Sequence, residues 1–434
     1  MHSLEKKQIN TNLDNILKEI GMNISKLGKY SFFKIAIVVQ IGYIIVALSL
    51  FFTVFYSTND FTVFYDAGNR VIFNIDKLYF RENNDFFFRY LPLSALIYTP
   101  FSLLGFNVSY ITFMFFNLAL NVGICIYIYK IITLINTNRN ACDERMARYI
   151  SLFLGASPQV NNYILGQNNL IVIFLILMAI FLFIKHNSIQ GDFLGSFLIG
   201  ISICVKPIAF LAVPFLLIMN YEVKERKIRL DVKKSLMRTV GALLFLLPNV
   251  AVFYLKPALW DGFLSNNFAG GNIIEIKHSF SLTKLILNGF TFFNIPVNQT
   301  IIFLSLLFLI GITGFLFYIL DNTNRKSILY GLSLGMLVLL LVYYDTWDHH
   351  LLIIIPLFIL IIFDIPNDSK IAKNYLKPSL YFFVFIDLIF MGIWYLMKAW
   401  FPFNFPPTIF LMLSFYGIIK FISSEKQKNL DENI

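Results

Sequence analysis

Charged residues are scarce in this sequence. They make up 14% of its 434 residues, whereas soluble domains carry roughly 25%. Hydrophobic residues make up 58%, against roughly 45–50% in soluble domains. This balance excludes a soluble globular protein and predicts an all-α polytopic membrane protein. At about 20 residues per membrane span, the chain has room for about twelve transmembrane helices.

The sequence also lacks the residue spacings typical of a metal site. Of its three cysteines, Cys125 and Cys204 lie in apolar runs and Cys142 lies in a basic loop. No spacing of histidines and acids puts three ligands on one helix face. We therefore expect no metal and no other cofactor. Internal repeats, low-complexity segments and a separate soluble domain are absent from the sequence as well.

The net charge of +10 would suggest a nucleic-acid partner in a soluble protein. Here the basic residues fall in short loops between apolar runs, and positively charged loops of membrane proteins stay in the cytoplasm. The charge therefore indicates orientation, and no nucleic acid is expected as a partner. We predict an integral protein of the plasma membrane with both termini in the cytoplasm.

This placement divides the chain into three parts. Residues 1–34 precede the first apolar run, and their apolar residues recur at helical spacing, which predicts a cytoplasmic interfacial helix. The alternative for this segment is a disordered tail. Residues 35–422 form the transmembrane domain, with long external loops at residues 57–90 and 256–299, the first carrying juxtamembrane helices. Residues 423–434 form a cytoplasmic tail.

The shorter apolar runs are placed by the same rule. Residues 149–165 and 380–396 each predict one span, whereas residues 91–104 contain two prolines and are expected to dip into the outer leaflet and return. Residues 193–219 suit one span by length, but one span would send seven basic residues of the following loop outside. We therefore predict a hairpin of two short helices broken at Lys206, which then lies at an external turn.

This topology gathers four polar sites at the outer membrane face. The first is the stretch at residues 57–70, which holds two acids among aromatic residues just after the first span. The others are a Gly-Gln-Asn-Asn turn, the lysine of the broken hairpin, and a pair of histidines in a late turn. Intramembrane and juxtamembrane charges are usually functional. The candidate residues are Asp60, Asp66, Gln167, Asn168, Lys206, His349 and His350.

Each of these sites has a structural alternative. The two acids are preferred N-cap residues for the juxtamembrane helices, and the amide turn is compatible with an ordinary loop. The lysine could extend to the interface from a structural helix, and the histidines could belong to a polar and aromatic belt at the headgroup level. The convergence of the four sites favours function over these alternatives.

Several motifs, in this order, resemble a known family. They are NDFTVFYDAG after the first span, FRYLPLSALIYTPFSLL entering the next helix, the GQNN turn, CVKP, and TWDHH. Together they resemble the GT-C-fold glycosyltransferases that use polyprenyl-phosphate sugars, and most closely glycosyltransferase family 87, the alpha-mannosyltransferases that take mannose from polyprenyl-phosphate-mannose. The resemblance runs from about residue 55 to about residue 355 and implies a GT-C-like bundle.

The resemblance also implies roles for single residues. An aspartate at the start of the first external loop is the general base in that family, which matches Asp60, with Asp66 as a second catalytic candidate. A histidine of the late turn contacts the donor phosphate, which matches His349 or His350. Asp348 departs from the family pattern and leaves open which histidine faces the site. The paired-acid motif of metal-dependent relatives is missing around Asp60.

The candidate substrate-binding residues share a position in these motifs or turns; they are Arg89, Tyr90, Gln167, Asn168, Lys206, His349 and His350. The partners implied are a polyprenyl-phosphate-sugar donor, membrane lipids, and a glycolipid, glycan or protein acceptor. A base removes the acceptor proton while cations hold the leaving phosphate, so one displacement inverts the anomeric carbon. The expected activity is therefore transfer of a hexose, with mannose favoured, on the extracytoplasmic face.

A polytopic transporter or lipid flippase is the alternative. Discontinuous helices and intramembrane charge occur in transporters, where they build sites near the middle of the membrane. The charged residues here cluster at one predicted face, and no inverted hydropathy repeat is evident. Asp387 is the one acid found inside a predicted span.

Overall fold

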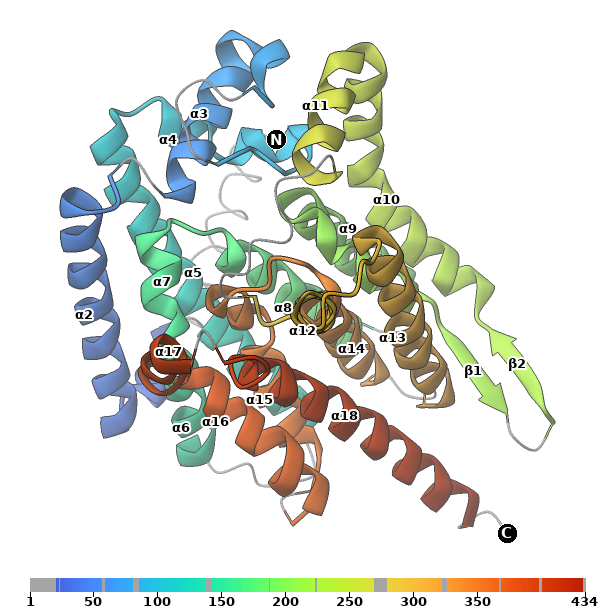
Figure 1. Cartoon of the computed structure of the whole chain (residues 1–434). Helices are drawn as coiled ribbons and strands as arrows, with labels where there is room; N and C mark the ends of the chain where they lie inside the picture. The colour runs from blue at the N-terminus through green and yellow to red at the C-terminus, as the bar shows by residue number, and fades with distance from the viewer. Residues whose placement is uncertain are drawn as a thin grey trace, which may run out of the picture.

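Figure 1 shows the computed structural model of the chain, a bundle of helices with one short β-hairpin at an end. The structure describes all residues except 1–20, 23, 57–58, 81–85, 137–142, 187, 223–224, 269–278, 322–325, 367, 398–399 and 432–434. Most of the helix predicted over residues 1–34 lies outside the described residues.

Among the described residues, five helices are long and apolar enough to cross a membrane. They are α2 (Ser31–Thr53), α5 (Phe106–Ile135), α10 (Val232–Leu255), α13 (Gln299–Asp321) and α18 (Pro406–Asp431). Three shorter apolar helices accompany them: α8 (Asn169–Lys185), α9 (Ile189–Val205) and α14 (Ser327–Val342). The predicted class is confirmed: this is an all-α polytopic membrane protein, and the total of about twelve spans stays a prediction.

The helices divide into a core and an outer layer. Every residue of α14 is buried, and so are nine of the ten residues of α15 (Ile355–Asp364). By contrast, only 11% of the apolar window of α13 is buried inside the protein, and 28% of that of α2. A helix that is apolar on all sides either fills a core or faces lipid. Here α14 and α15 fill the core, whereas α2 and α13 expose much of their apolar surface, as helices that face lipid do.

Short helices of the first long loop, together with α11 of the second, lie at one end of the bundle, at the top of Figure 1, whereas α12 of the second loop lies nearer the middle. The first long loop (residues 57–90) holds α3 (Asp60–Phe73) and η1 (Ile75–Lys77), and η2 (Pro92–Ile97) and α4 (Thr99–Ser102) follow it. The second long loop (residues 256–299) holds α11 (Pro257–Phe268) and α12 (Leu282–Phe292). Helices in the first long loop were predicted.

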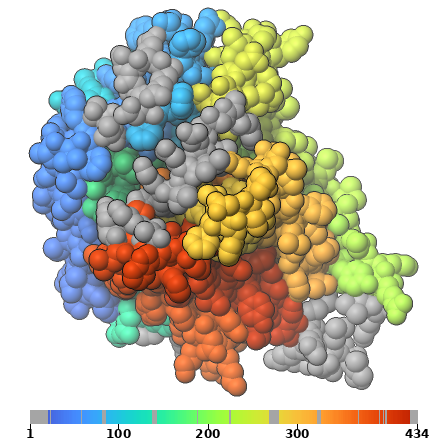
Figure 2. Space-filling view, in the orientation of Figure 1, coloured from blue at the N-terminus to red at the C-terminus, as the bar shows by residue number. Residues whose placement is uncertain are grey.

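The two long loops bind each other at this end. Lys256 Nζ lies 2.7 Å from Asp76 Oδ1, and the Asn266 side chain donates hydrogen bonds to the carbonyls of Tyr79 and Phe88. Figure 2 shows this meeting of blue and yellow-green segments at the top of the molecule. The loops therefore form one cap over the end of the bundle.

A feature of the opposite end was not predicted. Strands β1 (Met219–Glu222) and β2 (Lys227–Leu230) pair antiparallel in the basic loop between η3 (Pro207–Leu216) and α10. Arg229 and Glu222 form an ion pair of 2.9 Å across the two strands. Figure 1 places this hairpin far from α3 and α11, and β1 packs against α13.

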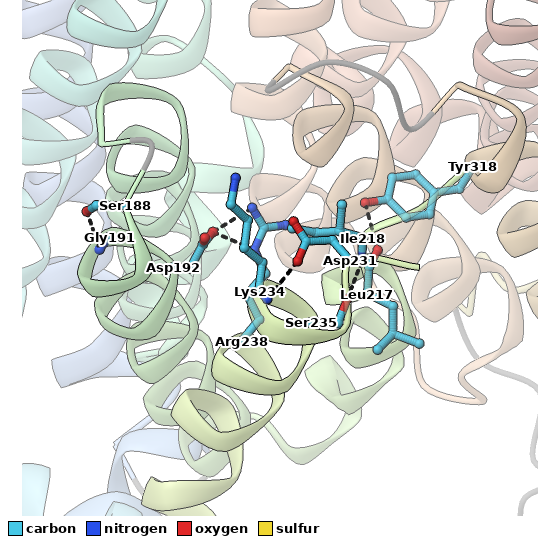
Figure 3. A network of polar contacts seen from close by, with 10 residues as sticks. All are labelled: Ser188, Gly191, Asp192, Leu217, Ile218, Asp231, Lys234, Ser235, Arg238 and Tyr318. Atoms are coloured by element: carbon cyan, nitrogen blue, oxygen red, sulfur yellow. Dashed lines mark hydrogen bonds and ion pairs between the residues drawn. The ribbon is translucent and has the colours of Figure 1, made fainter. Parts of the chain in front are cut away.

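A buried ion pair joins α9 to α10 near this hairpin (Figure 3). Arg238 of α10 lies 2.7 Å from Asp192 of α9, and both side chains are almost fully buried. The Arg238 guanidinium also lies over the Phe183 ring, 4.5 Å from its centre. Asp231 caps α10 by accepting the amide hydrogen of Lys234. These contacts fix the start of α10 against the bundle.

Two predicted spans are not continuous helices. Residues 149–165 are divided into α6 (Asp143–Leu154) and α7 (Pro158–Ile164), because a proline begins the second segment. Two side chains of α2 satisfy the carbonyls freed at the break: Gln40 donates to Leu154 and Tyr43 donates to Gly155. The break was not predicted from the apolar run.

The stretch at residues 380–396 is broken as well. It forms α16 (Lys377–Val384) and α17 (Ile386–Met397), bent by 73° between them. The last helix, α18, continues past the predicted end of its span near residue 422 into the predicted tail. The remaining elements are η4 (Asp348–Ile353) and η5 (Ala372–Leu376). Residues 193–219 are broken at Lys206 into α9 and η3, as predicted.

Candidate active site

A cavity of about 340 Å³ lies under the cap formed by the two long loops. Its wall combines charged and polar side chains with aromatic ones. The residues that line it are Asp60, Val63, Phe64, Phe86, Phe87, Arg89, Tyr90, Leu165, Gln167, Lys206, Pro207, Asn267, Tyr343, Asp345, Trp347, His349 and His350. Elements from residue 60 to residue 350 thus contribute to one site.

Asp60 is the first residue of α3. Asn59 caps this helix, because its buried side chain accepts the amide hydrogen of Thr62 at 3.0 Å. The cap therefore comes from Asn59, which leaves the Asp60 carboxylate free to line the cavity. Its place in the first helical turn also favours the negative charge, since the helix N-terminus is the positive end of the helix dipole.

The Gly-Gln-Asn-Asn turn holds Asp60 from the other side. The side-chain amide of Gln167 donates a hydrogen bond to Asp60 Oδ2, and the amide of Phe61 donates to the carbonyl of Leu165 at 3.1 Å. Gly166 has a φ of +63°, and a Cβ there would lie 2.5 Å from the Phe61 Cβ. Only glycine fits this turn, which explains its presence beside the amides.

Burial raises the pKa of Asp60 above its usual value. Neighbouring groups oppose this shift; in order of size they are His349, the hydrogen bond from Gln167, Lys206 and Arg89. A carboxylate in this environment is a stronger proton acceptor than one in water, while the cationic groups favour its charged form. The site therefore contains a base beside positive charge.

Lys206 occupies the break between α9 and η3 and is only 5% exposed. Its Nζ donates a hydrogen bond to Asn169 Oδ1 at the start of α8, and the Asn169 amide donates to Asn162 Oδ1 at 3.2 Å. Burial lowers the pKa of Lys206 to about 7, against the opposing attraction of Asp60. The amine is held by protein groups rather than extended to the membrane surface, so the structural alternative of a snorkelling lysine does not describe it.

The two histidines lie in η4, and both are buried at the cavity wall. His350 Nδ1 accepts the amide hydrogen of Trp347 at 2.9 Å, so the neutral ring carries its proton on Nε2. Burial, together with Lys206 and His349, keeps the pKa of His350 well below its usual value. His349 Nδ1 instead lies 3.5 Å from Asp348 Oδ1. The adjacent histidines thus have different partners.

Arg89 and Tyr90 form another part of the wall. Arg89 forms an ion pair of 3.1 Å with Asp345, and both side chains are about half-exposed. The Tyr90 carbonyl accepts a hydrogen bond from the Tyr79 hydroxyl at 2.7 Å, and its ring packs against Phe64. Asn267 of α11 donates to the Arg89 carbonyl at 3.2 Å. The second long loop therefore positions the backbone that carries Arg89.

The comparison with known families decides the class of protein to which this site belongs. The family model of glycosyltransferase family 87 matches residues 87–343, which is more than half of the chain. The chain belongs to glycosyltransferase family 87. It is thus a membrane glycosyltransferase, and the family does not support the transporter alternative. No curated protein matches the chain.

The family match covers only part of the cavity of this glycosyltransferase. Arg89, Gln167 and Lys206 fall inside the matched residues, whereas Asp60 precedes them and the two histidines follow them. The structure joins these parts, because Asp60 hydrogen-bonds Gln167 and shares the cavity with the others. Of the nine residues predicted from the sequence, seven line one cavity; they are Asp60, Arg89, Tyr90, Gln167, Lys206, His349 and His350.

Two predicted site residues of the glycosyltransferase do not line this cavity. Asp66 lies farther along α3. Asn168 is fully buried, and its side-chain amide donates to the Tyr98 hydroxyl at 3.1 Å and to the Val205 carbonyl at 3.2 Å. Asn168 thus ties the turn to η2 and α9. This geometry favours the structural alternative for Asn168.

Sequence reasoning missed some polar residues of the cavity. Tyr343 and Asp345 lie in the same stretch as the predicted histidines, and Asn267 lies in the second long loop. The proximity of Asp345 to the histidine pair could have indicated it, but no signal in the sequence places Asn267 beside Arg89. Within the described chain, no group of three or more histidine, cysteine or acidic side chains is placed to hold a metal ion. Independence from metal stays a prediction.

Proposed function

We propose that this glycosyltransferase moves a hexose, with mannose favoured, from a polyprenyl-phosphate donor to an acceptor hydroxyl, and that Asp60 is the general base. The observation that carries the proposal is the placement of Asp60 in one cavity with Lys206, Arg89 and two histidines. A base and several cationic or hydrogen-bonding groups are what displacement of a sugar from a phosphate requires.

The proposed step is a single displacement. The acceptor oxygen attacks the anomeric carbon, the bond from that carbon to the phosphate oxygen breaks, and its electron pair leaves with the polyprenyl phosphate. The acceptor proton passes to Asp60. Lys206, Arg89 and His349 stabilise the negative charge on the leaving phosphate. One displacement without a covalent enzyme intermediate inverts the anomeric carbon.

The lipid donor and mannose are proposed because the sequence motifs resemble the polyprenyl-phosphate-mannose-dependent enzymes of this family. Position in the bilayer supports a lipid donor, since the cavity lies at one end of a bundle of apolar helices. We further propose that this end is extracytoplasmic and that both termini are cytoplasmic. The basic β-hairpin at the opposite end supports this orientation. The acceptor is a glycolipid, a glycan or a protein.

The test is transfer by the purified protein in vesicles, with polyprenyl-phosphate-mannose as donor. Asp60→Asn keeps the size of the side chain but removes the base, so we expect transfer to fall by about 10²–10⁴-fold. Binding of the lipid phosphate should change little, because Asp60 does not hold the leaving group. Transfer by Asp60→Asn at the wild-type rate would remove Asp60 from the mechanism.

Asp66→Asn is the matched comparison, since it makes the same change in the same helix outside the cavity wall. The geometry predicts that its transfer rate stays within about twofold of wild type. A loss equal to that of Asp60→Asn would show that both acids are needed. A nucleotide sugar offered in place of the lipid donor should give no transfer; transfer from it would contradict the lipid donor.

A further inference from the structure

A second group of carboxyl side chains lies behind His349 and has no part in the proposed reaction. It consists of Asp348, which precedes this histidine in η4, and Asp387 of α17. The Asp348 side chain is 8% exposed, and both carboxyl oxygens of Asp387 are buried. Buried carboxyl groups are unfavourable unless hydrogen bonds satisfy them, so this pair requires a physical explanation.

Asp348 is surrounded by donors. The side-chain amide of Asn161 from α7 donates to Asp348 Oδ2, and His349 Nδ1 lies 3.5 Å from Asp348 Oδ1. The Asp387 carboxyl is near enough for the two acids to influence each other electrostatically. Burial by itself raises the pKa of Asp348, but the adjacent His349 ring, the Asn161 amide and the Asp387 carboxyl outweigh burial and hold it below its usual value. Asp348 is therefore the ionised member of the pair.

Asp387 has the opposite surroundings. Within the described residues, neither of its carboxyl oxygens accepts a hydrogen bond from a donor. The Ser157 hydroxyl accepts the backbone amide hydrogen of Asp387, and the Tyr43 hydroxyl from α2 donates to the Gly155 carbonyl. A second negative charge beside Asp348 would be strongly unfavourable there. The pair is satisfied if Asp387 keeps its proton and donates it to Asp348.

His349 has one buried nitrogen that needs a partner. Its side chain is 6% exposed, and in the described structure Nδ1 makes no hydrogen bond within ordinary limits. The contact to Asp348 Oδ1, at 3.5 Å, is at the outer limit of a hydrogen bond. A small rotation of the ring closes it. Since His350 Nδ1 is already taken by the Trp347 amide, Asp348 serves His349 alone of the two histidines.

We propose that Asp348 is a positioning residue for His349: it accepts the Nδ1 hydrogen and turns Nε2 toward the cavity, while a protonated Asp387 and Asn161 hold Asp348 in place. This inference rests on the proposed function in one respect, namely that His349 contacts the donor phosphate. An adjacent carboxylate that accepts the Nδ1 hydrogen fixes the orientation of the ring, so that its other nitrogen can face a phosphate.

The test is a double-mutant cycle read by binding of a polyprenyl phosphate without sugar to the protein in nanodiscs. In Asp348→Asn, one amide oxygen replaces a carboxylate that accepts from His349, Asn161 and Asp387 in the proposal. The His349 ring therefore loses its carboxylate partner. We expect Asp348→Asn and His349→Ala each to weaken binding by about tenfold. If Asp348 acts through His349, the double variant should bind no more weakly than His349→Ala. Losses that multiply to about 100-fold would overturn the proposal.

Asp387 provides a second, independent test. The amide of Asp387→Asn can donate to Asp348 as the protonated carboxyl does, so binding should stay within about twofold of wild type. Asp387→Leu removes that donor and should weaken binding in the protein that keeps His349. Added to His349→Ala, it should weaken binding no further. Equal losses in Asp387→Asn and Asp387→Leu would show that Asp387 is not a neutral donor and would overturn its part of the proposal.

Two safeguards keep the result interpretable. If Asp348→Asn does not fold, as judged by thermal unfolding, Asn161→Leu takes its place in the cycle with His349→Ala. This variant removes the Asn161 amide that donates to the Asp348 carboxylate. The binding measurement needs no sugar transfer, so it is separate from the test of Asp60. Wild-type transfer by Asp60→Asn would overturn the proposed base and leave the cycle standing. Losses of binding that multiply in the double variant would overturn the positioning of His349 and leave the Asp60 result standing.

Discussion

Lys206 is the residue whose charge the cavity controls most directly. Its amine is almost fully buried, and it donates to Asn169 while Asp60 lies close enough to attract it. The neutral form of a buried lysine becomes accessible near neutral pH because desolvation penalises the ammonium. A lysine in this state can change its charge when a phosphate enters, which a water-exposed lysine cannot do at the same pH.

A pH dependence follows for binding of the polyprenyl phosphate. The pKa of Lys206 is about 7, so the amine is protonated below this pH and neutral above it. The affinity should therefore fall as the pH rises from about 6 to about 9, once the charge that attracts phosphate is lost. Lys206→Arg keeps its charge over this range, and its binding should depend less on pH.

The measurement is a binding titration of wild type and Lys206→Arg at several pH values in the same nanodiscs. Equal pH dependence in the two proteins would mean that another group, such as the phosphate itself, controls the effect. Affinity of wild type that does not change with pH would contradict a lysine with a lowered pKa.

At the level of elements, the site depends on how α3 meets the turn before α8. The Phe61 amide donates to Leu165, and Gly166 leaves no room for a side chain because Phe61 lies against it. The turn therefore fixes the start of α3, and Gln167 then reaches Asp60. The position of the base is set by contacts about one hundred residues away along the chain.

Gly166→Ala tests this dependence. A left-handed backbone costs a non-glycine residue about 1–2 kcal/mol, and the new Cβ would also displace Phe61. We expect a lower unfolding temperature together with slower sugar transfer, because the Gln167–Asp60 contact is lost.

The matched control is Gly42→Ala in α2, where no atom lies within 4 Å of an added Cβ. Alanine is the better helix former, so this variant should keep its stability and its transfer rate. If Gly166→Ala behaved like Gly42→Ala, the turn would not determine the position of Asp60.

The elements also show where prediction from sequence ends. The break at Lys206 could be predicted, because proline follows it and the charge of the next loop required a return. The break between α6 and α7 could not, although a proline is present there too. What stabilises it are side chains of α2, Gln40 and Tyr43, that lie 112 or more residues away from the carbonyls they satisfy. Such partners have no local signal.

For the whole molecule, the placement of basic loops predicted more than single motifs did. It brought Asp60, Gln167, Lys206 and the histidine pair to one end of the membrane domain, and these residues line one cavity. It could not predict that Asn168 points into the protein, because that orientation depends on contacts with Tyr98 and Val205, which are distant along the chain. Nor could it predict the contact of Asn267 with Arg89, since that depends on how two loops fold over each other.

The orientation of the whole molecule can be measured by cysteine labelling. Asp76→Cys lies at the cavity end and Glu225→Cys lies beside the β-hairpin, and both native side chains are about half-exposed or more. In a protein with Cys142→Ser, the native Cys125 and Cys204 are buried and should react little. An impermeant reagent outside intact cells should label Asp76→Cys and should reach Glu225→Cys only after permeabilisation.

The reverse pattern would place the cavity in the cytoplasm and contradict the proposed face. Labelling of both positions in intact cells would mean that the cells are leaky, which a cytoplasmic marker protein would reveal in the same experiment.

The outward surface of α13 has a practical consequence. Only 11% of the apolar window of that helix is buried inside the protein, so its outward apolar side chains take whatever amphiphile surrounds them as their solvent. An unfolding temperature recorded in one detergent therefore belongs to the protein and its micelle together. Variants can be ranked only when they share the same micelle or the same lipid disc, and the choice of surfactant will itself change how stable the enzyme is when purified.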